Sequence, residues 1–166
     1  MTSRDRYRRI CAFIFGAMAS IIVFAAAPAN AQSGPFSALA GSWGGGGKID
    51  FSDGSSERLR CRATYAVAGG GSSAQLTLRC ASDSYNFTLT SNVTSQGGAV
   101  SGTWSESNRG IGGTLSGRTN GTTMQLQVLG AAFAAGLSLT VSGNRQIVQI
   151  SAPASQIKLA TITLTK

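Results

Sequence analysis

The sequence predicts an all-β domain: an antiparallel meander of about eight to ten short strands that closes into a small barrel. Short segments in which apolar and polar residues alternate recur after residue 40, and this alternation is typical of strands with one buried face. Turn residues separate the segments at close intervals, among them Asp-Gly, Asn-Gly and Gly-Gly-Gly sequences, which favour hairpins. Outside the first 31 residues, no window shows helical periodicity.

The alternation and the turn residues together define the strands that we expect. They are residues 42–51, 57–67, 74–81, 85–93, 99–106, 112–118, 122–129, 137–143, 145–151 and 157–165. Residues 128–139 could form a short helix, but Gly130 and Gly136 favour a hairpin with a small apolar turn. Short connections of this kind favour a closed barrel whose interior is filled or holds one small ligand. A β-sandwich is the main alternative, and a membrane barrel, with strands of about 9–11 residues, is a weaker one.

One hairpin is defined well enough to predict its register. A turn at residues 69–71 places Cys61 opposite Cys80 and gathers one apolar face from both strands. That face holds Leu59, Ala63, Tyr65, Leu76 and Leu78. Cys61 and Cys80 are the only cysteines after residue 31. A pair of cysteines in an exported chain is expected to form a disulfide rather than two buried free thiols.

The opposite face of the same hairpin is basic. It carries Arg60, Arg62 and Arg79, with Arg62 directly opposite Arg79, while Arg58 faces Asp83 in a predicted salt bridge. Like charges that face each other across two strands reduce stability. We therefore expect either an anion-binding surface or a solvated face that acidic residues of a neighbouring strand neutralise.

The chain begins with the pattern of a secretory signal peptide. Four arginines among the first nine residues precede an apolar run at residues 10–27, and residues 29–31 (Ala-Asn-Ala) form a small-x-small cleavage site. We expect residues 1–31 to be removed and residues 32–166 to form one domain, although the apolar run is also long enough for a membrane anchor. The mature protein would then be periplasmic or secreted, exported by the general or the twin-arginine route.

The composition excludes much of the usual chemistry. The chain has no histidine, so the commonest general base and metal ligand is missing. Glu57 and Glu106 could form a glycosidase pair only if the fold brought them together. Asp50, Asp53 and Glu57 lie close together in the sequence but lack the spacing of an EF-hand calcium loop. We therefore expect no enzyme, no cofactor and no metal site. Cleavage would leave 10 basic and 5 acidic residues, a modest excess that suits an anionic partner but also favours solubility.

Trp43, Trp104 and Tyr65 are the aromatic residues that we expect in the core or against a ligand. Trp43 belongs to a Gly-x-Trp sequence at residues 41–43, which resembles the opening of the calycin barrels, the lipocalins and avidins, where the tryptophan plugs or lines the barrel. The sequence Leu-Ala-Gly-Ser-Trp followed by a disulfide also resembles small periplasmic barrel inhibitors of bacterial metalloproteases. With LAGSW, SERLRCRATY, LRCASDSY and SGTWSE, the chain as a whole resembles a group of small exported β proteins of Gram-negative bacteria, a resemblance that implies no activity.

These observations predict an exported, non-enzymatic barrel. We expect it to bind either a small apolar ligand inside or an anionic component of the cell envelope on its surface. The alternative is a periplasmic inhibitor or another protein-interaction module. We expect no membrane span after cleavage, and no nucleic-acid partner, because no aromatic residues alternate with the arginines.

Overall fold

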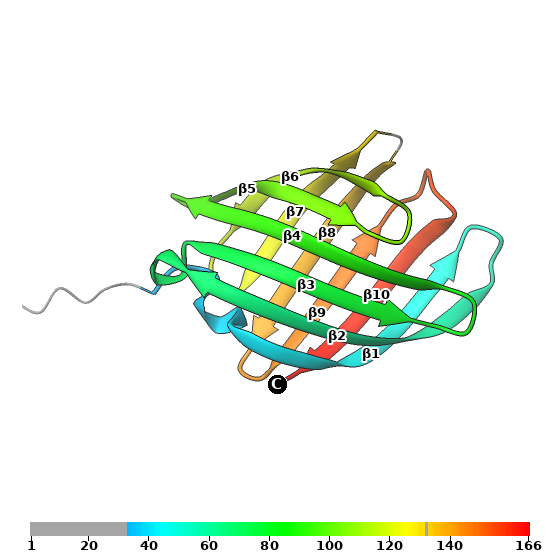
Figure 1. Ribbon diagram of the computed structural model, residues 1–166, viewed down its shortest axis with the longest axis horizontal. Helices are drawn as coiled ribbons and strands as arrows, with labels where there is room; N and C mark the ends of the chain where they lie inside the picture. The colour runs from blue at the N-terminus through cyan, green and yellow to red at the C-terminus, as the bar shows by residue number, and fades with distance from the viewer. Residues whose placement is uncertain (1–32, 132) are drawn as a thin grey trace, which may run out of the picture. The chain divides into compact units, whose positions relative to one another are not determined.

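The computed structural model describes residues 33–131 and 133–166, which form a closed barrel of ten antiparallel strands (Figure 1). The predicted leader, residues 1–31, lies outside the described residues. The strands are β1 (Gly41–Phe51), β2 (Ser56–Ala68), β3 (Ser73–Ala81), β4 (Asn86–Gln96), β5 (Ala99–Glu106), β6 (Ile111–Thr119), β7 (Thr123–Gly130), β8 (Phe133–Ser142), β9 (Arg145–Ser151) and β10 (Ile157–Thr165).

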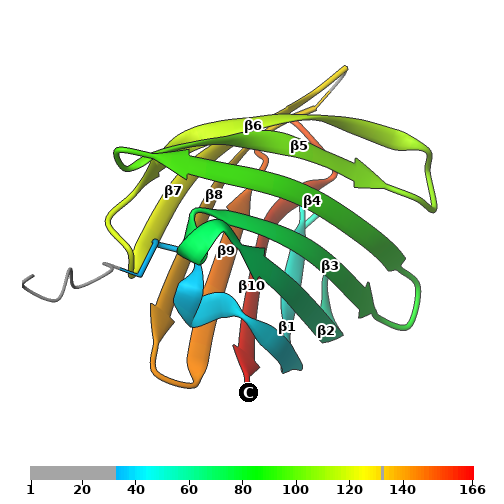
Figure 2. The same cartoon turned by 60° about the vertical axis from the view of Figure 1, so that its left-hand side comes forward.

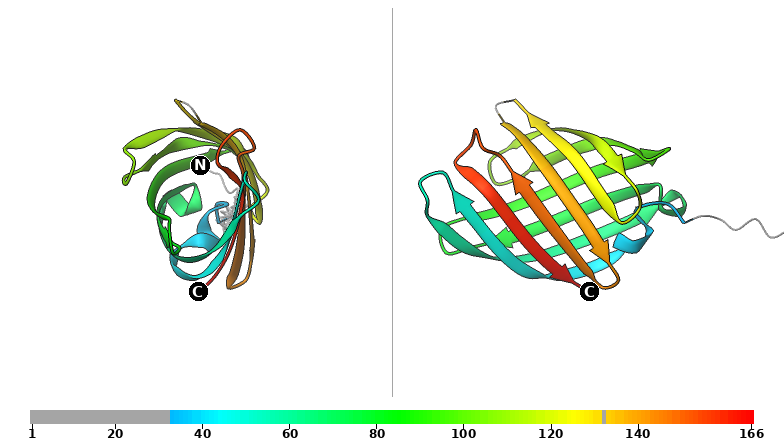
Figure 3. Two further views of the ribbon diagram at one scale, coloured as in Figure 1. Left: turned by 90° about the vertical axis from the view of Figure 1, so that its right-hand side faces the viewer. Right: turned by 180° about the vertical axis from the view of Figure 1, so that it is seen from behind.

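The strands form a simple meander that closes on itself. Each strand pairs with its neighbours in the sequence, and β1 closes the ring by pairing with β10. Figure 3 shows the strands from the side and arranged as a ring. The predicted meander and closed barrel are therefore confirmed, and the alternative of a sandwich of two open sheets is excluded.

Alternation along each strand separates an apolar interior from a polar exterior. In β2, Leu59, Cys61, Ala63 and Tyr65 are buried, while each residue between them is exposed. The same pattern recurs in β7 and β9. Among the described residues, no helix is long and apolar enough to cross a membrane.

Most strand positions agree with the prediction, but several strands are longer than expected. The largest error is in β8, which begins at Phe133 and not at residue 137. Gly136 does not end this strand because it lies within the ladder, paired with Gln127 and Ser151 of the neighbouring strands. The predicted hairpin in this region is confirmed, since β7 ends at Gly130 and β8 follows after two residues.

The glycine run at residues 44–47 lies where the barrel closes, between β2 and β10. A Cβ atom at Gly45 or Gly47 would collide with the backbone oxygen of Thr163 or Thr161 in β10. The run therefore permits a close approach of β1 and β10. The one irregularity of the β1–β10 ladder lies further along β1, between Asp50 and Phe51.

A short N-terminal segment closes one end of the barrel. The 3-10 helix η1 (Ser37–Leu39) lies here, with Phe36 and Leu39 buried. The backbone N–H groups of Gly34 and Phe36 donate to the carbonyls of Gly70 and Gly71 in the β2–β3 turn, at 2.7 and 3.0 Å. Figure 2 shows η1 and this turn at the same end of the barrel. We call residues 34–40 the plug.

Candidate functional site

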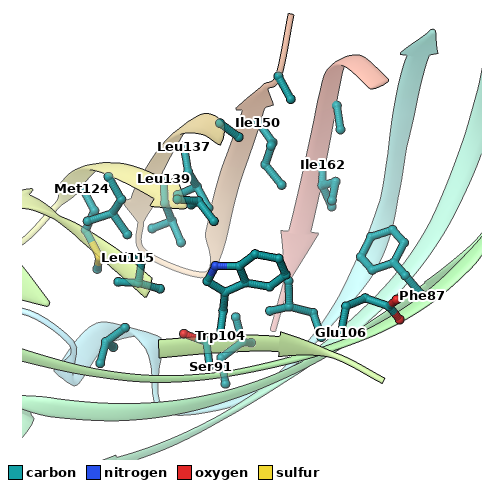
Figure 4. A pocket seen from close by; sticks show the side chains of 18 of the residues that line it. Phe87, Ser91, Trp104, Glu106, Leu115, Met124, Leu137, Leu139, Ile150 and Ile162 are labelled. Atoms are coloured by element: carbon teal, nitrogen blue, oxygen red, sulfur yellow. The ribbon is translucent and has the colours of Figure 1, made fainter. Parts of the chain in front are cut away.

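The barrel interior contains an apolar cavity of about 240 Å³. All ten strands contribute side chains to its wall, and Phe36 and Leu39 of the plug line its closed end. Figure 4 shows leucines, isoleucines and Met124 around the central space. Because nearly all lining groups are hydrocarbon, the cavity suits an apolar molecule.

Trp104 of β5 is the largest side chain that lines this cavity. Its indole projects into the space towards Leu137, Leu139 and Ile150 (Figure 4). The indole Nε1 donates to the backbone oxygen of Leu129 at 3.1 Å, which fixes the orientation of the ring. A bound molecule would therefore contact a ring that is already held in place.

Ser91 supplies a polar group part of the way along the cavity. It is 5% exposed and pairs with Trp104 across β4 and β5, so its side chain lies beside the indole (Figure 4). The alternation of β4 gave a signal that could have identified it. Residues 87, 89, 91 and 93 point to the same face of the strand, and an apolar residue is expected at each of them. Ser91 is the exception among Phe87, Leu89 and Val93.

The cavity reaches the surface at the end opposite the plug. Ile111 lines the cavity and is nevertheless 46% exposed, so this end is open. Tyr85, Phe87 and Arg109 lie at the same end, in or next to the β3–β4 and β5–β6 turns. We call this end the mouth.

Glu106 is a buried carboxylate at the mouth, 6% exposed. It accepts hydrogen bonds from the backbone N–H groups of Asn108, Arg109 and Thr88, at 2.8, 2.9 and 3.2 Å. Burial by itself raises the pKa of Glu106, but these bonds and the Arg109 guanidinium outweigh it, so the pKa is lowered. Glu106 therefore stays charged and holds the β5–β6 turn in place.

Arg109 lies at the edge of the mouth with its guanidinium held from two sides. Its Nη1 is 3.3 Å from Glu106 Oε2, and its Cζ lies 4.2 Å from the centre of the Tyr85 ring. The same Nη1 donates to the backbone oxygen of Asn86 at 3.3 Å. The side chain is 40% exposed, so a cation remains accessible where the cavity meets solvent.

A buried polar pair lies towards the closed end. The Tyr65 hydroxyl, which borders the cavity, donates to Gln146 Oε1 at 2.9 Å. Burial raises the pKa of Tyr65 far above its usual range, an effect that the hydrogen bond to Gln146 only partly offsets. Tyr65 is therefore a neutral donor. Gln146 is completely buried, and its Nε2 has no hydrogen-bond partner among the described residues.

The three aromatic residues predicted for the core or a ligand have different positions. Trp104 and Tyr65 line the cavity, whereas Trp43 does not. Trp43 is 2% exposed, and its Nε1 donates to the backbone oxygen of Leu39 at 2.6 Å. Lys166 Nζ lies 4.9 Å from the centre of the Trp43 ring. Trp43 is thus a structural residue that joins β1 to the plug.

The predicted disulfide is confirmed. Cys61 and Cys80 are bonded across β2 and β3, with a Cα–Cα distance of 4.2 Å. The register is the predicted one at every paired position of this hairpin. The expected apolar face also points inwards, with Leu59, Ala63, Tyr65 and Leu78 buried and Leu76 partly buried.

The predicted arginines lie on the outer face of the same hairpin. Arg60, Arg62 and Arg79 are exposed, and Arg62 pairs directly with Arg79. The predicted salt bridge between Arg58 and Asp83 is wrong. The described residues contain no such contact, because β3 ends at Ala81 and Asp83 lies in the following turn.

The acidic residues considered for catalysis or calcium have structural partners. The Glu57 carboxylate accepts hydrogen bonds from the hydroxyls of Ser82 and Ser84, which fastens β2 to the β3–β4 turn. Asp53 accepts from Ser55 within its own turn, and Asp50 pairs with Lys48 at 2.6 Å. The part of the chain that the structure describes contains no group of three metal-ligating side chains.

Comparison with known proteins supports the fold and assigns no family. No family model matches the chain, and no curated protein shows significant similarity to it. The fold is similar to that of Rv2717c from M. tuberculosis, with a TM-score of 0.58 and 18% identity over 78% of this chain and 94% of that one. It is also similar to the S-type phycobiliprotein lyase CpeS from Guillardia theta, with a TM-score of 0.51 and 10% identity over 78% and 86% of the two chains. At these identities the likeness concerns the fold alone.

Proposed function

We propose that this protein is an exported, non-enzymatic barrel that binds a small apolar ligand in its interior. One observation carries the proposal: a continuous apolar cavity with a wall of all ten strands, a plug at one end and a mouth at the other. Export is supported by the signal-peptide pattern of residues 1–31. The disulfide supports it independently, since such bonds persist in oxidising compartments.

The dimensions and the polar groups restrict the ligand. Its apolar part has to fit about 240 Å³, slightly below the usual range of about 300–1,000 Å³ for ligand pockets. Ser91 offers one hydroxyl beside Trp104, and Arg109 offers a cation at the mouth. The chemistry favours a molecule with an apolar body and few hydrogen-bonding groups, whose polar end points to the mouth.

A binding role is also favoured over catalysis by the state of the ionisable groups that border the cavity. The Glu106 carboxylate already accepts hydrogen bonds from three backbone N–H groups and from the Arg109 guanidinium. Tyr65 is held neutral by burial and donates to Gln146. Neither group is poised to accept a proton from a substrate.

The test compares two neighbouring alanines of β8. Ala135 is buried and lines the cavity, whereas Ala134 is the next residue and is exposed on the outer face. Ala135→Phe places a ring in the cavity, and Ala134→Phe places the same ring outside. The probe is N-phenyl-1-naphthylamine, an uncharged apolar fluorophore, and the readouts are its fluorescence gain and energy transfer from tryptophan.

We expect the unmodified protein and Ala134→Phe to bind about one probe per chain with equal affinity. Ala135→Phe should bind about tenfold more weakly or worse, a loss of about 1.4 kcal/mol. Circular dichroism establishes that both variants are folded. Equal binding by the two variants, or no binding by the unmodified protein, would show that the cavity is not a ligand site.

A further inference from the structure

The outer face of the disulfide hairpin forms a second hollow, separate from the interior cavity. It has a volume of about 640 Å³ and lies over β1 to β4, with Asn108 of the β5–β6 turn at its edge. Arg60, Arg62 and Arg79 border it, and we call it the arginine groove. We infer that the arginine groove is a binding site for phosphate-bearing anions, a function that does not depend on a ligand inside the barrel.

The register concentrates positive charge in this groove. Arg62 and Arg79 are directly paired across β2 and β3, which places their Cβ atoms about 5 Å apart. Arg60 is two residues away on β2, about 7 Å along the same face. Three exposed arginine side chains therefore start from neighbouring positions and border the same hollow.

The neighbouring strands do not neutralise these charges. On one side, β1 places Gly46 beside Arg60 and Gly44 beside Arg62. On the other side, β4 places Thr88 beside Arg79. Within residues 33–131 and 133–166, no hydrogen bond or ion pair engages the three guanidinium groups. No acidic residue pairs with the three arginines in the sheet, so the neighbouring strands do not supply the neutralising charge that the alternative of a solvated face required.

Of the acidic residues that the structure describes, all except Asp83 of the β3–β4 turn are engaged elsewhere. Asp50 pairs with Lys48, and Glu106 pairs with Arg109 at the mouth. Glu57 and Asp53 accept hydrogen bonds from serine hydroxyls. Arg62 and Arg79 consequently repel each other at close range, a cost that a bound anion would remove.

The groove is also held in shape for a ligand. The Cys61–Cys80 disulfide joins the two strands directly behind the arginines, because Arg60 and Arg62 flank Cys61 and Arg79 precedes Cys80. Gly44 has no atom within 4 Å of where its Cβ would be, so the groove is unobstructed there. Preorganised strands lower the entropy that is lost when an anion binds.

Phosphate is the chemistry that fits best. The planar guanidinium group of arginine donates two parallel hydrogen bonds to phosphate or carboxylate. A phosphate monoester carries up to two negative charges, and therefore matches three neighbouring cations better than a single carboxylate does. The phosphate could belong to a lipid headgroup at a membrane surface or to a soluble phosphorylated molecule.

The experiment uses protein purified after expression of the full-length chain, with two charge-matched variants. One variant replaces Arg60, Arg62 and Arg79 by serine. The control replaces Arg118, Arg145 and Lys158 by serine, three exposed cations of β6, β9 and β10 that lie outside the groove. Binding is measured to phosphatidic acid–phosphatidylcholine vesicles, whose anionic headgroup is a phosphate monoester, by co-sedimentation, and to pyrophosphate by calorimetry. Pure phosphatidylcholine vesicles are the uncharged reference.

We expect each groove arginine to contribute about fivefold to binding at an anionic surface, and the three together about 100-fold. The control variant should lose clearly less, and all binding should weaken between about 0.1 M and 1 M salt. Loss confined to the vesicle arm assigns the phosphate to lipid, and loss in the pyrophosphate arm assigns it to a soluble ligand. Equal losses of affinity in the two variants would mean that net charge alone causes binding, which would overturn the inference. Failure of the unmodified protein to bind either probe would overturn it as well. Thermal melting separates these outcomes from misfolding, because removing a like-charge pair should leave the melting temperature unchanged or higher.

Discussion

Substitution of Trp43 and Trp104 by alanine tests whether one tryptophan stabilises the fold while the other lines the ligand cavity. Both are buried, at 2% and 8% exposure, but only Trp104 faces the cavity. Trp43→Ala removes a side chain that is packed on all sides together with its hydrogen bond to Leu39. A tryptophan buries about 200 Å², which corresponds to about 5 kcal/mol of transfer free energy. Because the unfolded chain buries part of this area as well, we expect a loss of about 3–5 kcal/mol.

Trp104→Ala should cost about half as much, roughly 2 kcal/mol, because the void beside the indole already deprives it of contacts. Trp43→Phe keeps most of the apolar area and leaves the Leu39 carbonyl without its donor, which should cost about 1–2 kcal/mol. The free energy of unfolding is measured by urea denaturation followed by circular dichroism, since the substitutions alter tryptophan fluorescence. Equal losses for Trp43→Ala and Trp104→Ala, or a loss below about 1 kcal/mol for Trp43→Ala, would refute this reasoning.

Two further predictions concern the disulfide and the mouth. Cys61 and Cys80 are 19 residues apart, so replacing both by alanine should lower the free energy of unfolding by about 3 kcal/mol; denaturation under non-reducing conditions measures this, and no change would contradict the loop-entropy estimate. Since the pKa of Glu106 is lowered in the folded state, its contribution to stability is present above about pH 4.3 and is lost as the pH falls through the folded pKa. Melting temperatures from pH 7 to pH 3 should therefore fall less steeply for Glu106→Gln than for the unmodified protein, and parallel curves would exclude this role.

The sequence was most informative where a single register satisfies several constraints at once. In the β2–β3 hairpin, the cysteine pair, the apolar inner face and the arginines all require the same turn at residues 69–71. A shift of one residue would move every side chain to the opposite face, so this hairpin could be predicted position by position. The start of β8 could not be predicted in this way, because a glycine such as Gly136 is compatible with a turn as well as with the interior of a strand.

The candidate site was less accessible to prediction than the fold. A cavity results from the difference between the volume that the strands enclose and the volume that their side chains fill, and alternation does not encode this difference. The mouth depends on contacts between separate turns, such as Arg109 with Tyr85 and Asn86. Trp43 and Trp104 also have the same local pattern, and only the closed barrel shows which of them faces the cavity.

The glycine run of β1 has a consequence for the order in which the chain can assemble. One edge of β1 pairs with β2, the next strand in the sequence, and can form early. Its other edge pairs with β10, the last strand of the barrel, and can form only when the rest of the chain is in place. Until then, residues 44–47 form an open edge without side chains, and an open edge is where chains pair wrongly with one another. Glycine is a weak strand former, so this edge attracts foreign strands less than a run of valines or threonines would. The same residues later allow β10 to approach closely, which means that a barrel without β10 would keep a weakly pairing edge and lack its final closure.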